Sequence, residues 1–134
     1  MKLHQFTVKT GRHTEMLDLT ARLQVLVAQS GVSEGLCFVY VPHTTAEIMI
    51  NENADPTVCR DIETTLESLV PWQGNYLHSE GNSAAHLKSA LLGCSQSLII
   101  EQGRLALGTW QGISLCEFRI NGGSRRIVIT ISGE

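Results

Sequence analysis

At 134 residues the chain has the size of one domain, long enough to bury roughly two-thirds of its unfolded surface in a single core. Apolar residues make up 43% of it and charged residues 17%, a balance that excludes a disordered chain and a coiled coil. The net charge is −3 and Lys and Arg form no run, so we expect no nucleic-acid partner. No apolar stretch reaches the roughly 18 residues that a membrane span needs, so we expect no membrane partner either.

The first third of the chain predicts a strand, a helix and two more strands. Residues 3–9 carry a weak strand signal, and from Thr14 the apolar positions follow the 3.6-residue period of an amphipathic helix. Thr14 is the expected N-cap of this helix and Gly31 its left-handed stop residue. The continuous β-prone run 36–41 predicts a strand covered on both faces, and residues 45–50 predict the next strand.

The middle of the chain predicts two helices joined by a polar loop. Asp55-Pro56 is a strong helix start, since an N-cap side chain precedes proline at the first helical position. Helical spacing continues to Val70-Pro71. After a polar loop over residues 72–82, a short helix capped by Asn82 or Ser83 runs to Gly93.

The last forty residues are strand material. Residues 97–101, 104–107, 113–119 and 126–132 are β-prone and separated by glycine-marked turns at hairpin spacing. Helices early and hairpins late, without a strand–helix–strand rhythm, predict an α+β fold of one domain, residues 1–134, with mostly antiparallel sheets.

The four cysteines predict a reducing compartment. They lie far apart, at positions 37, 59, 94 and 116, and none forms a Cys-x-x-Cys pair. Since Cys37, Cys94 and Cys116 fall in or beside apolar runs, buried free thiols are favoured over disulfides. The N-terminus also lacks the apolar core of a signal peptide, so we expect a cytoplasmic protein.

Three of the five histidines lie between Val41 and His86, and we expect them to converge on one site. His43 follows the strand that Pro42 ends, His78 lies in the polar loop, and His86 lies in the first turn of the short helix. Three neutral imidazoles with one open position are typical of a divalent-metal site. The alternative is that these are ordinary loop and helix histidines, because their spacing matches no self-identifying zinc motif.

Several carboxylates accompany the histidines. Asn51, Glu52 and Asp55 follow a strand end, where they would hold hydrogen bonds to the imidazoles or act as a general base. The other interpretation of Asp55 is a plain helix cap. Glu117 is the one charge in an otherwise apolar strand segment, so it is either an inward functional carboxylate or an edge residue.

Two further segments are candidates for ligand contacts. Gly108-Thr109-Trp110-Gln111-Gly112 combines a flexible backbone with an indole that can stack on a planar ring, or it is a tight turn with Trp110 folded onto the sheet. Arg125 and Arg126 are neighbours in a strand, so only one of them can face a given pocket, where an arginine would favour phosphate.

Taken together, these motifs resemble the YjbQ family, also called the secondary thiamine-phosphate synthase family. The resemblance covers nearly the whole chain. It rests on His-Thr-Thr-Ala at 43–46, Ile-Asn-Glu at 50–52, Ala-Asp-Pro at 54–56, His-x-Glu-Gly-Asn-x-x-Ala-His at 78–86 and Gly-x-Leu-x-Leu-Gly-Thr-Trp-Gln-Gly-Ile at 103–113.

The resemblance implies a jelly-roll-like β-sandwich with helices packed on it, assembled as a ring-shaped homotrimer. It also implies a pocket for a metal or an anion, and a small phosphorylated metabolite as the partner. Three histidines suit zinc, nickel, cobalt or iron alike, and zinc is the first choice of divalent metal. The implied reaction joins a hydroxymethylpyrimidine diphosphate to a thiazole phosphate and releases pyrophosphate. The competing hypothesis is a trimeric protein that binds a phosphorylated or anionic metabolite without catalysis.

The resemblance and the residue types together give three sets of candidate site residues. We expect catalytic roles for His43, Glu52, Asp55, His86 and Glu117, and metal binding by His43, His78 and His86. We expect substrate contacts from Thr44, Thr45, Asn51, Asn82, Gly108, Thr109, Trp110, Gln111 and Arg126.

The chain departs from the family pattern at two places. Glu47 stands where the family usually has a small residue, which adds a charge close to His43 or faces solvent. The Asn121-Gly122-Gly123-Ser124 turn replaces a shorter one, so the match of Arg125 or Arg126 to the family's arginine stays open.

Overall fold

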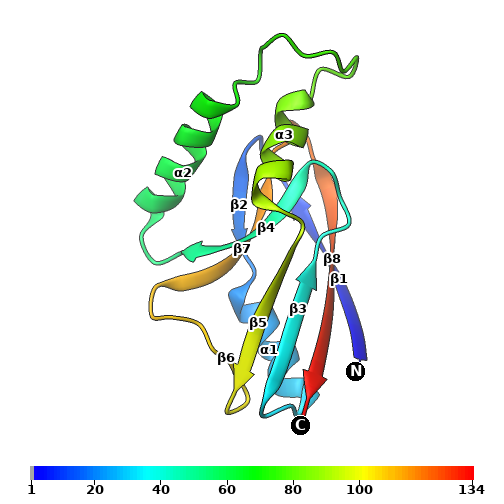
Figure 1. Cartoon of the computed structure of the whole chain (residues 1–134), viewed down its shortest axis with the longest axis vertical. Helices are drawn as coiled ribbons and strands as arrows, with labels where there is room; N and C mark the ends of the chain where they lie inside the picture. The colour runs from blue at the N-terminus through cyan, green and yellow to red at the C-terminus, as the bar shows by residue number, and fades with distance from the viewer. Residues whose placement is uncertain (1) are drawn as a thin grey trace.

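The computed structural model describes residues 2–134, which form eight strands and three helices (Figure 1). The strands are β1 (Lys2–Thr10), β2 (Glu15–Asp18), β3 (Gly35–Tyr40), β4 (Ala46–Glu52), β5 (Ser95–Glu101), β6 (Arg104–Leu105), β7 (Gln111–Glu117) and β8 (Gly123–Gly133). The helices are α1 (Thr20–Ser30), α2 (Pro56–Leu69) and α3 (Ser83–Leu92).

The strands form two antiparallel sheets. The larger sheet has the order β1-β8-β3-β5-β6 and the smaller one the order β2-β7-β4. Every strand pair among the described residues is antiparallel, which confirms the predicted α+β class with mostly antiparallel sheets. In the smaller sheet, β4 and β7 pair from Ala46 opposite Glu117 to Glu52 opposite Gln111.

One hydrophobic core joins the inner faces of both sheets to α1. Cys37 and Val39 of β3 pack in the same cluster as Ile48 of β4, together with Leu23 and Val27 of α1, and all five are fully buried. Alternation along the strands produces this layer, because every second side chain of a strand points to the same face.

A second, smaller cluster lies on the other face of the three-stranded sheet, where α2 and α3 cover it. Its buried members are Leu66 of α2, Ala85 of α3, and Cys116 and Phe118. The fully buried Lys88 of α3 pairs with Glu67 of α2, which ties the two helices together. This layer explains why α3 lies against β4 at the upper end of the molecule in Figure 1.

Glu47 faces this second layer and does not face solvent. Its neighbours Ala46 and Ile48 face the main core, so Glu47 faces the helices, beside its cross-strand partner Cys116. Its side chain is buried and Oε2 has no hydrogen-bond partner among the described residues. Burial raises the pKa of Glu47 to about 7.

The predicted helix starting at Thr14 begins later in the structure. Residues Glu15–Asp18 form β2, which pairs with β7 and places Met16 opposite Cys116. Thr14 has a left-handed backbone in the turn before β2, and α1 starts at Thr20, whose N–H donates to Asp18 Oδ1. The apolar pattern of 16–19 fits either structure, and pairing with β7 decides it. The predicted stop at Gly31 is confirmed.

The prediction that strand 36–41 is covered on both faces is wrong. In β3, Leu36, Phe38 and Tyr40 point away from the core and are 51%, 42% and 40% exposed. No described element covers this outer face of the five-stranded sheet. The continuous apolar run therefore reflects an exposed apolar surface as well as the core.

Only one of the three predicted hairpin connections joins paired strands. β5 and β6 form a hairpin, whereas β6 and β7 belong to different sheets, and so do β7 and β8. The glycines of 108–112 and 122–123 therefore mark crossings between the sheets, where the chain needs the same tight turns as in a hairpin.

The remaining local predictions agree with the structure. α2 begins after Asp55, whose side chain accepts the Thr57 N–H, and α3 runs from its N-cap Asn82 to Gly93. All four cysteines are free, as predicted; Cys37 and Cys116 are buried, but Cys94 is exposed, contrary to its apolar surroundings in the sequence. Among the helices that the structure describes, none combines the length and hydropathy needed to cross a lipid bilayer.

Candidate functional site

The three histidines of the predicted site line one pocket of about 460 Å³. It lies where the β3–β4 loop, the loop before α3, the start of α3 and the β7–β8 connection come together. The rings of His78 and His86 stand edge to face with centroids 5.3 Å apart. The lining residues are Pro42, His43, Thr44, Thr45, His78, Glu80, Asn82, His86, Arg119 and Arg125.

Local chain geometry brings His78 and His86 to the same wall. Gly81 has a left-handed backbone (φ +74°) and its N–H donates to the His78 carbonyl oxygen at 3.2 Å, so the loop turns sharply into α3. Asn82 is the N-cap position of α3, and its side chain is buried with Oδ1 lacking a hydrogen-bond partner among the described residues. The pocket thus contains a buried amide oxygen that is free to accept a hydrogen bond.

His43 is held in one orientation by the backbone of β8. Its Nε2 accepts the Arg126 N–H at 2.9 Å. Burial lowers the pKa of His43, and the charges of Arg125 and Arg126 lower it further against an opposing effect of Glu117. A neutral imidazole that accepts at Nε2 carries its proton on Nδ1. His43 is therefore a hydrogen-bond donor through Nδ1–H at neutral pH.

Arg125 is held at the pocket by a buried ion pair with Glu117. Its Nε donates to Glu117 Oε1 at 2.7 Å, and its Nη2 donates to Glu117 Oε2 at 2.5 Å and to Thr45 Oγ1 at 2.8 Å. Both charged side chains are almost fully buried. Such a two-point pair fixes the plane of the guanidinium group. Its Nη1 makes no hydrogen bond to any described residue.

Glu117 has its acceptor sites filled by several donors. Besides Arg125, Thr10 Oγ1 donates to Oε1 at 2.7 Å and the Arg119 N–H donates to Oε2 at 3.1 Å. Burial raises the pKa of Glu117, but the hydrogen bonds from Arg125, Thr10 and Arg119 and the charge of Arg125 outweigh it, so the net shift is downward. A Cβ at Gly122 would lie 1.7 Å from Oε1, so only glycine fits there.

These contacts change two of the predicted roles. Arg125, and not Arg126, turns its side chain toward the pocket, whereas Arg126 is exposed and contributes its backbone N–H to His43. Glu117 lies behind Arg125 and is absent from the pocket lining. It therefore positions Arg125 and has no free lone pair of the kind that a general base needs.

Seven of the predicted site residues lie away from this pocket, around the other end of the β4–β7 pair. The pocket adjoins the end where Ala46 faces Glu117, and the two ends are six residues, about 20 Å, apart. Trp110 is 64% exposed there. The residues of this second group are Asn51, Glu52, Asp55, Gly108, Thr109, Trp110 and Gln111.

Local hydrogen bonds account for the second group. The Gly108 N–H donates to Gln111 Oε1 at 2.8 Å and the Gln111 N–H donates to the Gly108 carbonyl oxygen at 3.1 Å, which closes a tight turn. Asp55 accepts the Thr57 N–H and hydroxyl, and these bonds lower its pKa. Within one chain, segment 108–112 is therefore a tight turn and Asp55 is a helix cap, the simpler of the two interpretations in each case.

A family model described as "UPF0047 protein YjbQ-like" matches residues 4–134. The chain belongs to the YjbQ/UPF0047 family. A UPF0047 protein of Methanocaldococcus jannaschii is 49% identical over 116 residues, 87% of this chain and 84% of that protein. The UPF0047 protein YugU of Bacillus subtilis is 46% identical over 117 residues, which cover 87% and 89% of the two chains.

Solved structures of YjbQ/UPF0047 proteins have the same fold. An uncharacterised protein of this family from Clostridium acetobutylicum superposes with a TM-score of 0.93 at 46% identity, covering 96% of this chain and 99% of that one. A YbjQ-like protein of unknown function from Sulfolobus solfataricus gives 0.95 at 31% identity, covering 99% and 97%.

The residues of this YjbQ-family pocket do not fit a metal centre of three imidazoles. His43 would have to give up its hydrogen bond from the Arg126 N–H, or ligate through the nitrogen that carries its proton. Within residues 2–134, no three His, Cys, Asp or Glu side chains are arranged to hold a metal ion. Among the histidines, the pair His78 and His86 is left as possible ligands, beside the cation Arg125, which disfavours a metal.

Three pocket residues were missed by the sequence analysis. Glu80 and Arg119 line the pocket, and Pro42 forms part of its wall. Glu80 lies within the family motif at 78–86, so its place in the histidine segment was a usable signal. Arg119 follows a buried strand end and nothing in its local sequence points toward the histidines.

Proposed function

We propose that the pocket binds the phosphate groups of a small metabolite and that the chain acts as a transferase of the thiamine-phosphate synthase type. The observation that carries this proposal is the buried Arg125, whose guanidinium is fixed by Glu117 and Thr45 at a pocket that Arg119 also lines. Fixed cations and N–H donors are the groups that phosphate oxygens require.

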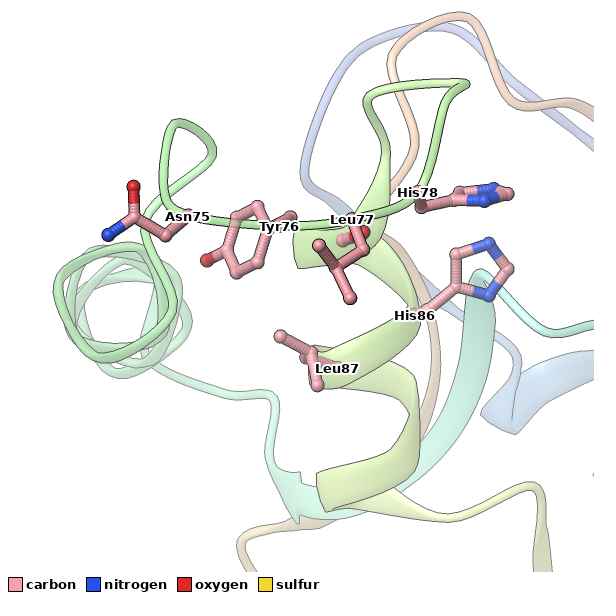
Figure 2. Close-up of a pocket in the computed structure, with 7 residues that line it drawn as sticks. Asn75, Tyr76, Leu77, His78, His86 and Leu87 are labelled. Carbon is pink, nitrogen blue, oxygen red and sulfur yellow. The ribbon is translucent and has the colours of Figure 1, made fainter.

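The surrounding donors support an anionic ligand. His43 offers Nδ1–H while its other nitrogen is occupied, and the exposed Thr44 lines the same pocket. The imidazoles of His78 and His86, shown in Figure 2, line the same pocket and would supply further hydrogen bonds. Glu80 is the one carboxylate in the pocket lining, and it would accept a hydrogen bond from a hydroxyl or amine of the ligand.

In the proposed reaction a thiazole nitrogen attacks the methylene carbon of hydroxymethylpyrimidine diphosphate. The new C–N bond forms as the C–O bond to the diphosphate breaks, and pyrophosphate leaves with the electron pair. The negative charge that develops on the leaving oxygen would be stabilised by Arg119, Arg125 and the Nδ1–H of His43. Preorganised donors of this kind contribute roughly 3–4 kcal/mol each in other enzymes.

The test is a direct assay. Purified protein given both precursors should form thiamine phosphate and pyrophosphate, and His43→Ala should lower the rate about 100-fold, in line with the loss of one preorganised donor. Asp55→Ala is the matched control, because Asp55 caps α2 away from the pocket. If both variants keep the full rate, the pocket is not the site of the reaction.

The second candidate is a non-catalytic protein that binds a phosphorylated metabolite. It is favoured because none of the carboxylates expected to act in catalysis is available as a base in the pocket. Glu117 has its lone pairs engaged, Asp55 caps a helix and Glu52 lies at the far end of β4. A strain without its main thiamine-phosphate synthase separates the two. Expression at native level should restore growth without thiamine under the transferase proposal, and leave the strain dependent on thiamine under the binding proposal.

We also propose the assembly that the family resemblance implies, a jelly-roll-like sandwich in a ring-shaped homotrimer. Support comes from the exposed outer face of the five-stranded sheet, where Leu36, Phe38 and Tyr40 of β3 are exposed and Leu36 pairs with the exposed Ile99 of β5. Uncovered apolar faces of this kind mark interaction sites. Light scattering should give three times the mass of the 14.7 kDa chain, and a monomer at micromolar concentration would contradict the proposal.

A divalent metal, zinc first, is retained as a proposal for the same pocket. Its ligands would be His78 and His86, with His43 outside the coordination shell because its Nε2 is engaged. Elemental analysis of protein purified without a histidine tag tests this, and an equimolar metal that disappears in His86→Ala would support it. The free thiols support the accompanying proposal of a cytoplasmic location.

A further inference from the structure

The two edges of the five-stranded sheet differ in length. β6 forms one edge with Arg104–Leu105 alone, whereas β1 forms the other edge with the nine residues Lys2–Thr10 (Figure 1). β1 pairs with β8 residue for residue along its whole length, so it has no bulge, and it contains no proline. Its other side pairs with no described strand. Half of its backbone N–H and C=O groups therefore point away from the sheet, where a further strand can pair with them.

A groove of about 310 Å³ lies between this edge strand and α1. The residues that line it are His4, Gln5 and Phe6 of β1 and Arg22, Val25 and Leu26 of α1. The three residues of β1 are consecutive, and consecutive side chains of a strand point to opposite faces. The groove therefore includes the open edge of β1 itself. It shares no residue with the pocket that the three histidines line.

The helix side of the groove is apolar and carries one cation. Val25 is 54% exposed, and Leu26 packs against the main core while it lines the groove. The guanidinium carbon of Arg22 lies 3.9 Å from the centre of the Phe6 ring, so the ring supports one face of the guanidinium group. The N–H groups of Arg22 lie in the plane of that group and make no hydrogen bond or ion pair with any described residue. They are thus free to bind a carboxylate at two points.

The edge strand and the helix carry positive charge, although the net charge of the chain is −3. No Asp or Glu lines the groove, and the charged residues of β1 and α1 are all Lys or Arg. His4 adds a buried Nε2 without a hydrogen-bond partner among the described residues. A second copy paired at this edge would bring its own Arg22 to the same groove. Charge complementarity therefore favours a different partner, one that is acidic.

We propose that β1 and α1 bind an extended acidic segment of another protein, which adds to the five-stranded sheet as a strand beside β1. Its backbone pairs with the open edge, its apolar side chains lie against Val25 and Leu26, and a carboxylate binds Arg22. In this mode of recognition the main-chain hydrogen bonds give affinity and alternate side chains give specificity. The inference is independent of the proposed transferase, and of the outer sheet face proposed for the trimer, because α1 packs on the inner face.

The test measures the binding of three peptides to the full chain by isothermal titration calorimetry. The first is acetyl-Thr-Val-Thr-Glu-Thr-Val-Thr-amide, in which the Val and Glu side chains share one face of a strand. The chain should bind it, and should bind a second peptide with Lys in place of Glu at least about tenfold more weakly. The third peptide is N-methylated at Glu and at the Thr before it. It should not bind, because one of two adjacent N–H groups has to donate to β1.

Arg22→Glu is the decisive variant. It should reverse the preference, so that the Lys peptide binds at least about tenfold more tightly than the Glu peptide. Arg104→Glu is the matched control, because Arg104 is an exposed arginine on β6, at the other edge of the same sheet. The control should keep the preference of the parent. Both arginines are exposed, so neither variant changes the core.

Hydrogen exchange locates the bound peptide. The backbone amides of residues 3–9 should exchange more slowly in the complex with the Glu peptide, because β1 then has partners on both sides. Unchanged exchange in β1 with the peptide bound would place the peptide on another surface and overturn the proposal.

The remaining outcomes also decide the proposal. It is overturned if the Glu peptide does not bind, if the N-methylated peptide binds as well, or if Arg22→Glu and Arg104→Glu behave alike. Light scattering separates a foreign segment from a second copy. An unchanged mass of the protein with the peptide bound supports the foreign segment. Dissociation of an assembly by the peptide would assign this edge to a second copy and overturn the proposal.

Discussion

The two ends of the β4–β7 pair carry polar residues of similar kinds and hold them in different ways. At the pocket end, Arg125 and Glu117 are buried and joined by two hydrogen bonds, and the backbone of β8 orients His43. At the other end Trp110 is 64% exposed and Asp55 caps α2 through bonds two residues away. A binding site is therefore marked by buried side chains held by contacts from distant parts of the chain, whereas polar composition alone also produces turns and caps.

The largest effect is expected from Arg125→Met. Removing one partner of a buried ion pair leaves Glu117 charged and unpaired, which should lower the free energy of unfolding by about 3–5 kcal/mol. Urea denaturation measures this, with Arg126→Met, an exposed side chain, as the control expected within about 0.5 kcal/mol. The double variant Arg125→Met, Glu117→Met should recover stability without recovering phosphate binding. An equal loss of unfolding free energy in Arg125→Met and Arg126→Met would mean that the buried ion pair does not stabilise the pocket end of β4 and β7.

Glu47 is a buried carboxyl near the pocket end without the hydrogen-bond partners that Glu117 has. Burial raises its pKa from 4.5 to about 7, so the folded state holds a proton that the unfolded state releases near pH 4.5. Stability conferred by this proton is complete below pH 4.5 and is lost as the pH rises through 7.

Glu47→Gln should therefore be more stable than the parent by about 2 kcal/mol at pH 9 and little changed at pH 5. Urea unfolding at several pH values between 5 and 9 measures the difference. A parallel pH dependence in both proteins would mean that Glu47 is ionised in the fold and has found a partner.

Asp55→Ala should cost about 1 kcal/mol of stability, the usual contribution of an N-cap, and leave phosphate affinity unchanged. The side chain accepts the Thr57 N–H at 2.9 Å and the Thr57 hydroxyl at 2.7 Å, and both bonds are local. Asp55→Asn keeps a capping oxygen, so its free energy of unfolding should fall by only a few tenths as much as in Asp55→Ala. A drop in phosphate affinity in both variants would show that this end takes part in binding.

Trp110→Ala should have the smallest effect, within about 0.5 kcal/mol in stability and with unchanged affinity for phosphate, because the indole is exposed far from the pocket. Calorimetry with inorganic phosphate measures the affinity. A loss of tenfold or more would indicate that Trp110 of one copy meets the pocket of another in the proposed trimer.

Much of the fold was predictable where the signal lies within a few residues and no contact from elsewhere in the chain overrides it. The Asp55-Pro56 start of α2, the Gly93 stop of α3 and the Gly31 stop of α1 depend on backbone chemistry within a few residues. The segment 15–18 was not predictable, since its apolar residues fit either a helix or a strand until β7 offers a partner. The sheet crossings at 108–112 and 122–123 have the same glycines as hairpins, so the sequence could not separate them.

The sequence predicted which histidines meet in the pocket but did not predict what each of them does there. His43, His78 and His86 line one pocket as the motifs indicate, yet a sequence does not tell which nitrogen of His43 is engaged. That nitrogen decides between a metal ligand and a hydrogen-bond donor. The pairing of Arg125 with Glu117 was equally hidden, because it depends on which faces of two strands in different sheets meet.

Residue type and spacing along the chain were enough to predict the family, the class of fold, the start of α2, the stops of α1 and α3, and the three histidines of the pocket. They did not show which arginine lines the pocket, that Glu117 holds Arg125 in place, or that the Trp110 turn lies at the opposite end of β4 and β7, which depend on how the two sheets pack. Strand register and the packing of two sheets set these facts, since a shift of one residue would turn every side chain of a strand to its other face.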